Sequence, residues 1–295
     1  MATALDESSA GASSPSPAEL AAQHALSPVG KRPRLSRYIQ QLWVRRHFIT
    51  TLALARVIAR NHEDRLGVLW NVLRPLLTAA IYGVVFGVLL PSSTRPRNFT
   101  AFIVIGVIVF TFSQDCFVKG ARSITRNLHI VRALHFPKAL LPIAQTLEEA
   151  IATVPGFVVM TLIVIATGET PNKAWLLLVP AFLLQMSFSL GLAFFAARVT
   201  VSVRDFAQLL PFIMRLVFYL SGIFYDVNRF HGNEWLFRLV KLNPFHVYIA
   251  VDRQALLGGH YASRYTWMLA VAWAFGLMAL AFLFFWRAEE RYGRE

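Results

Sequence analysis

The stretch FTAFIVIGVIVFTFSQDCFV, residues 99–118, is an almost unbroken apolar run. A helix of this length, at about 1.5 Å per residue, crosses the ~30 Å hydrocarbon core of a bilayer. The whole chain shares this character: 56% of its residues are hydrophobic, 15% are charged, and the mean hydropathy is +0.51. A soluble fold of 295 residues cannot bury so much apolar surface. The sequence therefore predicts an all-α integral membrane protein.

Further apolar runs lie on both sides of this stretch. Together they predict six transmembrane helices, at residues 75–90, 99–118, 139–167, 174–197, 206–224 and 265–286. The third run carries Pro155 and Gly156, which favours a kinked or tilted helix. Basic residues concentrate in every second connection and at both ends, so the positive-inside rule places the N- and C-termini in the cytosol.

The chain before the first run has two parts. Residues 1–33 are rich in Ala, Ser, Pro and Gly, which predicts a disordered cytosolic tail. Residues 34–66 are amphipathic, with Trp43 and several arginines, which predicts an interfacial helix in the membrane plane. The alternative is an ordinary solvated helix face. Residues 67–295 form the predicted six-span domain.

The connection at residues 225–264 is long and still apolar. Asn243-Pro244 is typical of a helix start and Gly258-Gly259 of a helix end. We expect two short helices here, Glu234–Leu242 and Pro244–Leu257, which dip into the membrane edge and form an extracellular gate.

No catalytic, metal-binding or nucleotide-binding motif is present in the sequence. We therefore expect no cofactor on this chain and no enzyme activity. Cys116 is the single cysteine, which excludes an intrachain disulfide. The net charge of +13 is distributed between apolar runs, which favours anionic lipid headgroups as partners over nucleic acid.

Charged residues fall well inside the predicted spans. Glu148 and Glu149 in the third span and Arg215 in the fifth each lie roughly 14 Å deep at 1.5 Å per residue. A charge at this depth is costly unless it is paired or hydrated. Two interpretations stay open: Arg215 forms an ion pair with Glu148 or Glu149, or it faces a water-filled path and contacts substrate phosphate.

Aromatic residues supply a second set of candidates. Tyr82 and Phe86 share one helix face, and Phe212, Arg215 and Tyr219 lie along another. Sugar rings stack on aromatic faces, so these five residues are candidates for lining a glycan channel. The alternative is ordinary helix packing or lipid contact.

The predicted cytosolic loop at residues 119–137 is the third candidate. Ile124, Leu128, Ile130 and Val131 have helical spacing, which predicts a short amphipathic helix that docks on a partner protein. The alternative is a basic loop that only sets orientation.

Residues 66–76, LGVLWNVLRPL, resemble the L-G-x-L-W-x-x-L-x-P-L signature of ABC-2-type permeases that export polysaccharides. Arg204-Asp205 and Leu242-Asn243-Pro244 are also similar to that family. The chain looks closest to the branch that exports the lipid-linked galactan of mycobacterial cell walls. It departs at Asp64, where the family often has Ser.

The resemblance implies a plasma-membrane homodimer with two copies of a separate ATPase subunit, which binds ATP and Mg²⁺. It implies a coupling helix within residues 119–137 and a channel between the first and fifth spans of both subunits. It also implies a polyprenyl-pyrophosphate-linked glycan as substrate. The basic residues near the cytosolic entrance are then candidates for binding the pyrophosphate: Arg56, Arg60, Arg65 and Arg74.

Other classes of protein compete with this interpretation. An ABC-2 exporter of a small lipid or drug fits the same topology. An ion-coupled secondary transporter is a second alternative, although no internal repeat is evident. A membrane enzyme is a third, with His129 and His135 as candidates by position only.

Overall fold

The computed structural model describes residues 34–63, 69–89, 96, 98–133, 136–227, 234–290 and 292. The predicted tail at residues 1–33, the entrance candidate Arg65, Asp64 and His135 lie outside the described residues, as does the start of the LGVLWNVLRPL segment.

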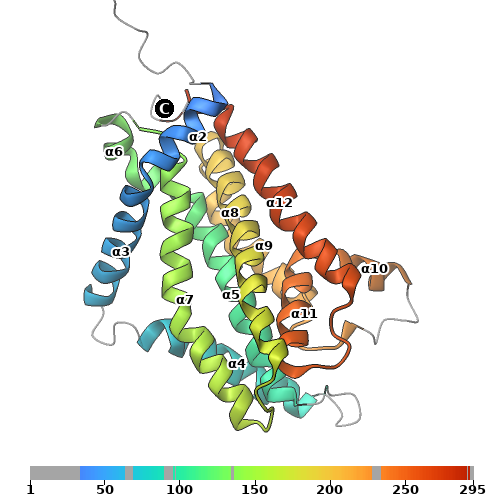
Figure 1. The fold of residues 1–295 in the computed structure, drawn as a ribbon. Helices are drawn as coiled ribbons and strands as arrows, with labels where there is room; N and C mark the ends of the chain where they lie inside the picture. The colour runs from blue at the N-terminus through green and yellow to red at the C-terminus, as the bar shows by residue number, and fades with distance from the viewer. Residues whose placement is uncertain are drawn as a thin grey trace, which may run out of the picture. The chain divides into compact units, whose positions relative to one another are not determined.

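The regular structure of the described residues is helical, as predicted (Figure 1). The helices are α2 (Leu35–Val44), α3 (Arg46–Glu63), α4 (Leu69–Leu89), α5 (Phe99–Ala121), α6 (Leu128–Ala133), α7 (Leu140–Ala166), α8 (Leu178–Ser202), α9 (Phe206–Leu220), α10 (Glu234–Leu242), α11 (Pro244–Leu257) and α12 (Arg264–Trp286). Short 3₁₀ turns precede α6 and α8.

Within the described residues, five helices are long and apolar enough to cross a membrane: α4, α5, α7, α8 with its 3₁₀ turn, and α12. The predicted fifth span is shorter than expected, because α9 has 15 residues and ends at Leu220. Gly222 follows at φ +69°, a left-handed conformation that stops a helix. Conversely, α4 begins earlier than predicted and continues through Pro75.

Helix α5 is the centre of the bundle, packed against α4, α7, α8, α9 and α11. Small residues permit the closest approaches. A Cβ on Gly120 would lie 2.6 Å from Ala193 Cβ, and one on Gly191 would lie 2.9 Å from the backbone nitrogen of Met278. Close backbone contact at small residues is typical of helix packing in membranes.

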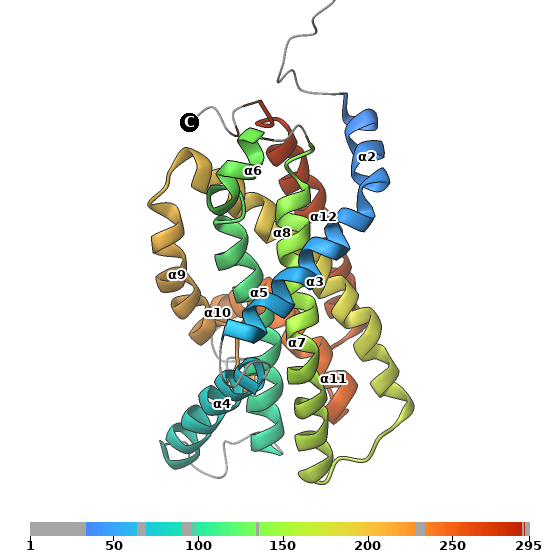
Figure 2. The ribbon, with the colours of Figure 1, turned by 90° about the vertical axis from the view of Figure 1, so that its left-hand side faces the viewer.

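The predicted N-terminal amphipathic helix is two helices, α2 and α3, separated at Arg45. Helix α3 runs beside α7 (Figures 1 and 2). Tyr38 of α2 is buried, and its hydroxyl donates to Glu289 Oε2 at 2.8 Å. Trp43 remains 70% exposed. The position of these helices at a membrane surface stays a prediction.

The two helices predicted in the long connection are confirmed as α10 and α11. Asn243 caps α11 by accepting a hydrogen bond from the Phe245 backbone, and Gly258 ends it at φ +67°. Helix α11 is almost wholly buried against α5 and α12. Its side chains therefore belong to the core of the bundle.

Candidate functional site

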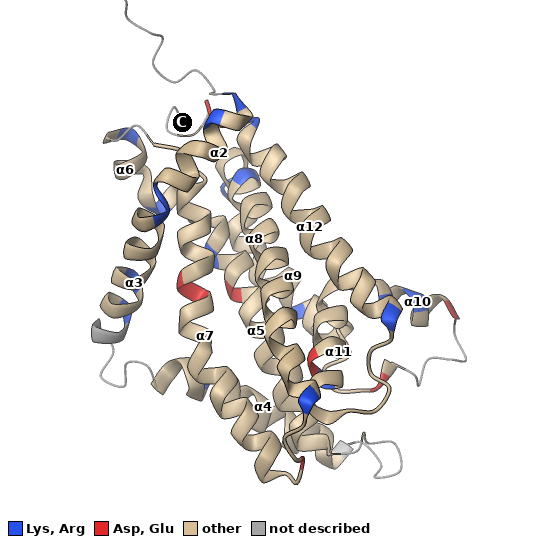
Figure 3. Cartoon of the chain, viewed as in Figure 1, with Lys and Arg blue, Asp and Glu red and all other residues tan. Residues whose placement is uncertain are grey.

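A cavity of about 850 Å³ lies among α3, α4, α5, α7 and α9. It collects many of the residues singled out from the sequence: Arg56, Arg60, Arg74, Tyr82, Glu148, Glu149 and Arg215. Among the remaining candidates, Phe86, Phe212 and Tyr219 are not in its lining. Acidic segments lie midway along α5 and α7, facing basic segments of α3 (Figure 3).

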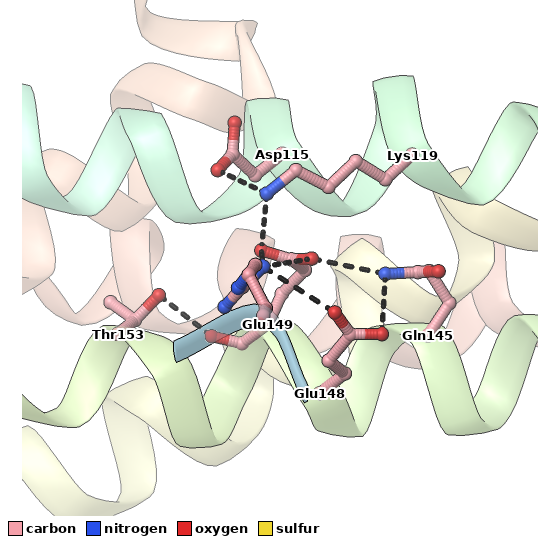
Figure 4. A network of polar contacts seen from close by, with 7 residues as sticks. Asp115, Lys119, Gln145, Glu148, Glu149 and Thr153 are labelled. Atoms are coloured by element: carbon pink, nitrogen blue, oxygen red, sulfur yellow. Dashed lines mark hydrogen bonds and ion pairs between the residues drawn. The ribbon is translucent and has the colours of Figure 1, made fainter. Parts of the chain in front are cut away.

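A network of charges forms one wall of this cavity (Figure 4). Lys119 of α5 contacts Glu149 Oε2 of α7 at 2.7 Å and Asp115 Oδ2 at 2.9 Å. Arg60 of α3 contacts Glu148 at 3.4 Å and Glu149 at 3.3 Å through a single nitrogen, Nη1. Two carboxylates that lipid would not tolerate as isolated charges are thereby neutralised.

Helical periodicity brings these groups together. Gln145 precedes Glu148 by three residues and Glu149 by four, so all three share one face of α7. Gln145 Nε2 donates to Glu148 Oε2 at 3.1 Å and to Glu149 Oε1 at 3.0 Å. Asp115 and Lys119 are likewise four residues apart on α5.

The expected ion pair between Arg215 and Glu148 or Glu149 is wrong. The partners of these acids are Arg60 and Lys119, while Arg215 is exposed in the cavity lining. Counting residues along the predicted spans gave Glu148, Glu149 and Arg215 similar depths. Helix α3 packs on α7, however, and places Arg60 beside the two acids.

Other basic side chains line the same cavity. Arg56 Nη2 donates to Asn127 Oδ1 at 2.9 Å. Arg74 places its guanidinium 5.7 Å from the centre of the Trp70 ring. Arg126 also lines the cavity. Basic groups therefore outnumber acidic groups around the cavity, which favours an anionic ligand.

The aromatic candidates form a cluster beside the cavity. Tyr82 Oη and Tyr219 Oη are 3.1 Å apart, and Phe86 stacks on Phe224 with ring centres 4.3 Å apart. Phe218 lies 5.4 Å from the Tyr82 ring. Three candidates thus pack on one another and join α4 to the end of α9. The fourth aromatic candidate, Phe212, is 69% exposed and does not line the cavity.

A second buried charge, missed in the sequence, holds the connection between α9 and α12 in place. Arg253 of α11 is 2% exposed and donates to the carbonyl oxygens of Phe102, Gly222 and Ile223 at 2.8–3.2 Å. Gly106 makes room for it, since a Cβ there would lie 2.8 Å from Arg253 Nη2. The outer end of α9 is thereby bound to α11 and α5.

The neighbouring carbonyls at the end of α9 are also bound by side chains. Asn243 Nδ2 lies 3.4 Å from the Leu220 oxygen and 3.2 Å from Ser221 Oγ. His246 Nδ1 is 3.2 Å from the Ser221 oxygen. The last carbonyls of a helix lack intrahelical partners, and Asn243 supplies one for Leu220, the final residue of α9. His246 and Arg253 bind the carbonyls of the turn that follows. We call the contacts of Asn243, His246 and Arg253 with these carbonyl oxygens the carbonyl clamp.

Only part of the helix predicted for partner docking forms: α6 contains Leu128, Ile130 and Val131, whereas Ile124 lies in a turn before the 3₁₀ segment. Ile124 and Val131 are 0% and 6% exposed and pack in a cluster with Tyr38 and Tyr292. Leu128 and Ile130 are partly exposed. What covers the apolar face depends on α2 and the C-terminal residues. Ile124 and Val131 therefore stabilise this chain, contrary to the expectation of a docking role.

Asp115, Lys119 and Arg253 form buried or partly buried polar contacts that sequence reasoning missed. Lys119 was assigned to a cytosolic loop, but α5 continues to Ala121. Its spacing of four residues from Asp115 was the available signal. Arg253 had none, because its ligands are backbone oxygens. Within the described parts of the chain, no group of three or more His, Cys, Asp and Glu residues could hold a metal ion.

Comparison with known proteins gives a consistent result. The model of the family described as ABC-2 type transporter matches residues 49–257. The O-antigen export system permease protein RfbA of Myxococcus xanthus is 23% identical over 224 residues, covering 76% of this chain and 85% of that protein. The polysialic acid transport protein KpsM of Escherichia coli is 23% identical over 215 residues, covering 72% and 82%. The capsule polysaccharide export inner-membrane protein CtrC of Neisseria meningitidis serogroup B is 24% identical over 192 residues, covering 64% and 72%.

Proposed function

The chain belongs to the ABC-2 type transporter family, and from this premise we propose that it is the permease of an ATP-driven exporter that moves a lipid-linked polysaccharide across the inner membrane. Family membership makes the chain a multi-pass membrane subunit and not an enzyme. The three relatives are an O-antigen export permease, a polysialic acid transport protein and a capsule polysaccharide export protein, which supports a polysaccharide as cargo.

The cavity is the observation that carries this proposal. Its walls include α4, α5 and α7, which are apolar enough to cross a membrane, together with the shorter apolar helix α9 and the more polar helix α3. The lining contains Arg74 and Arg215 from the apolar helices and Arg56 and Arg60 from α3. Such residues inside a membrane domain are costly unless they face water or a polar ligand. A lipid-linked glycan with a pyrophosphate group supplies an anion for the basic residues. The aromatic rings of Tyr82 and Phe218 in the lining supply faces for sugars.

The proposed substrate is a polyprenyl-pyrophosphate-linked galactan or O-antigen-like glycan. Within the proposal, the pyrophosphate enters near Arg56, Arg60, Arg65 and Arg74, and the glycan passes Tyr82, Phe86, Phe212, Arg215 and Tyr219. The termini lie in the cytosol and α10–α11 form the extracellular gate.

The proposed assembly contains two copies of this chain and two copies of a separate ATPase. The surfaces of α4 and α9 support the pairing of two copies of this chain, because both helices expose apolar side chains such as Val84, Val88, Phe212 and Leu216. The second copy would cover these faces and complete a channel. ATP and Mg²⁺ would bind to the ATPase, which docks near α6 through the partly exposed Leu128 and Ile130.

The test is co-purification of this chain with the ATPase encoded beside it, followed by ATP hydrolysis measurements. We expect a stable complex whose hydrolysis is stimulated by polyprenyl-pyrophosphate-linked glycan. Deletion of the chain should leave completed lipid-linked polymer on the cytosolic face. Loss of polymer synthesis would indicate an enzyme, and stimulation by small lipids alone would indicate a lipid or drug exporter. Absence of any complex with a monodisperse preparation would favour ion-coupled transport.

To test the docking site, Ile130→Glu in α6 is compared with Leu176→Glu in the 3₁₀ turn before α8, where Leu176 is exposed. Each adds a charge at an apolar site, but only Ile130 lies in the proposed ATPase contact. We expect Ile130→Glu to abolish co-purification with the ATPase and Leu176→Glu to retain it. Retention of the ATPase by Ile130→Glu would contradict this docking site.

A further inference from the structure

Arg60 uses only part of its hydrogen-bonding capacity. Its Nη1 atom contacts Glu148 and Glu149 at 3.3–3.5 Å, whereas Nε and Nη2 have no hydrogen-bond partner among the described residues. Nε and Nη2 form one edge of the guanidinium group, and this edge can bind two oxygens of a phosphate side by side. Arg60 lines the cavity, and neighbouring atoms cover its Nε and Nη2 in the present conformation. The unpaired bidentate edge therefore lies beside the cavity and meets a ligand when the Arg60 side chain turns toward it.

The acidic pair does not depend on Arg60 alone. Lys119 Nζ approaches Glu149 at 2.7 Å, which is the length of a strong charge-assisted hydrogen bond. Gln145 donates to both carboxylates at 3.0–3.1 Å. The Arg60 contacts, at 3.3 Å and beyond, are the longest in the network. Arg60 is thus its most loosely held cation.

We propose that Arg60 binds the phosphate oxygens of an anionic ligand through its Nε–Nη2 edge, and that Glu148 and Glu149 set the affinity by competing for the same guanidinium. This inference rests on the proposed function only in naming a diphosphate as the natural ligand. Arg56, Arg74 and Arg126 line the same cavity and add positive potential around the site. The carboxylates orient Arg60 and, being negative themselves, keep binding weak enough for the ligand to leave.

Competition for Arg60 predicts the direction in which anion affinity changes when a carboxylate is removed, whereas an ordinary structural ion pair does not. Removing one carboxylate charge should strengthen anion binding, because Arg60 is released and repulsion falls. If the acids served only to hold α3 on α7, the same change would leave anion affinity unaltered or reduce it through loss of structure.

The test uses the full-length chain in nanodiscs of zwitterionic phosphatidylcholine, titrated with inorganic pyrophosphate in a calorimeter. Relative to the unchanged protein, we expect Arg60→Gln to weaken binding at least tenfold and Glu148→Gln to strengthen it about tenfold. Arg60→Lys should be intermediate, since it keeps the charge but loses the bidentate edge. Glu234→Gln is the matched control, because Glu234 pairs with Arg238 in α10, away from the cavity, and should not change the affinity.

Size-exclusion profiles and thermal denaturation midpoints show whether each variant is folded. Wild-type affinity in a folded Arg60→Gln protein would overturn the proposal, as would unchanged or weaker binding in folded Glu148→Gln. The measurement needs neither the ATPase nor a glycan. If pyrophosphate binds as predicted but the cells export polysaccharide without this chain, the anion site stands and the proposed function fails. If export requires the chain but Arg60→Gln changes neither affinity nor export, the proposed function stands and the anion site at Arg60 fails.

Discussion

Arg60 and Arg253 are both arginines in the interior of the helical bundle, but the protein satisfies them in different ways. Arg253 is 2% exposed and all three of its nitrogens donate to backbone carbonyls. The Arg60 side chain is 28% exposed, lines a cavity and has one bonded nitrogen, which is shared by two carboxylates.

The difference separates a structural cation from an exchangeable one. Backbone carbonyls cannot rotate away from Arg253 without unwinding α5 or the turn after α9, so its contacts persist as long as the fold does. Carboxylates at 3.3–3.4 Å hold Arg60 weakly and have other partners. An incoming anion can therefore compete for Arg60, whereas nothing of similar size can enter at Arg253.

The largest expected effect is that of Arg253→Met. A buried polar group left without its partner costs about 1–3 kcal/mol, and this change affects three carbonyls. We expect a loss of about 3–5 kcal/mol, within the range of the most damaging substitutions. The thermal denaturation midpoint in detergent should fall sharply and the monodisperse fraction should decrease. A midpoint within 2 °C or so of the original would show that the carbonyl clamp is not structural.

Gly106→Ala attacks the same contact from the opposite side. The new Cβ would lie 2.8 Å from Arg253 Nη2 and 3.2 Å from Ile223 Cγ2, so the clamp must shift. Overpacking of this kind costs about 1–3 kcal/mol. Gly276→Ala in α12 is the control, because a Cβ there meets nothing within 4 Å. Equal denaturation midpoints for the two variants would contradict the steric argument.

In the network of the cavity wall, Lys119→Met should be more harmful than any change to Arg60. Lys119 makes the shortest contact with Glu149, and its loss leaves Arg60 as the remaining cation on that carboxylate. Its side chain is 33% exposed, so water offsets part of the loss and we expect about 1–2 kcal/mol. Denaturation at several salt concentrations measures this, and a destabilisation as large as that of Arg253→Met would erase the distinction between the two regions.

Arg60→Gln should have the smallest effect on stability, less than about 1 kcal/mol. The Arg60 side chain is 28% exposed and makes the longest contacts of the network, while Gln145 still binds both carboxylates and Lys119 still binds Glu149. Its denaturation midpoint should stay near that of the unchanged protein even though anion binding is lost. A large drop in the midpoint would show that Arg60 is structural after all.

Local patterns in the sequence were sufficient to predict the helices but not to predict which side chains of neighbouring helices contact one another. Asn243-Pro244 and Gly258 placed both ends of α11 correctly, because caps and breakers act within a few residues. The same reasoning placed Arg215 near Glu148 by depth alone. The depth of a residue along a helix does not show which way its side chain faces around the helix axis. Nor does depth indicate that α3 packs on α7 and brings Arg60 to the acids.

The apolar residues of α6 show the same limit. Their spacing predicted one helix from Ile124 to Val131, but α6 begins only at Leu128, after a turn and a 3₁₀ segment. Whether Ile124 and Val131 face a partner or the chain itself depends on Tyr38 and Tyr292, which come from the two ends of the described chain. A periodic pattern identifies an apolar face without saying what covers it.

The sequence by itself determined that this protein is an all-α membrane protein, where most of its helices begin and end, and that charges would be found inside it. These properties follow from hydropathy, chain length and local backbone preferences. Only the tertiary structure decided that Arg60 and Lys119 neutralise Glu148 and Glu149, and that Arg253 binds the end of α9. Such pairings join residues from 30 to 151 positions apart, and they depend on how packed helices are rotated against one another, which no local pattern encodes.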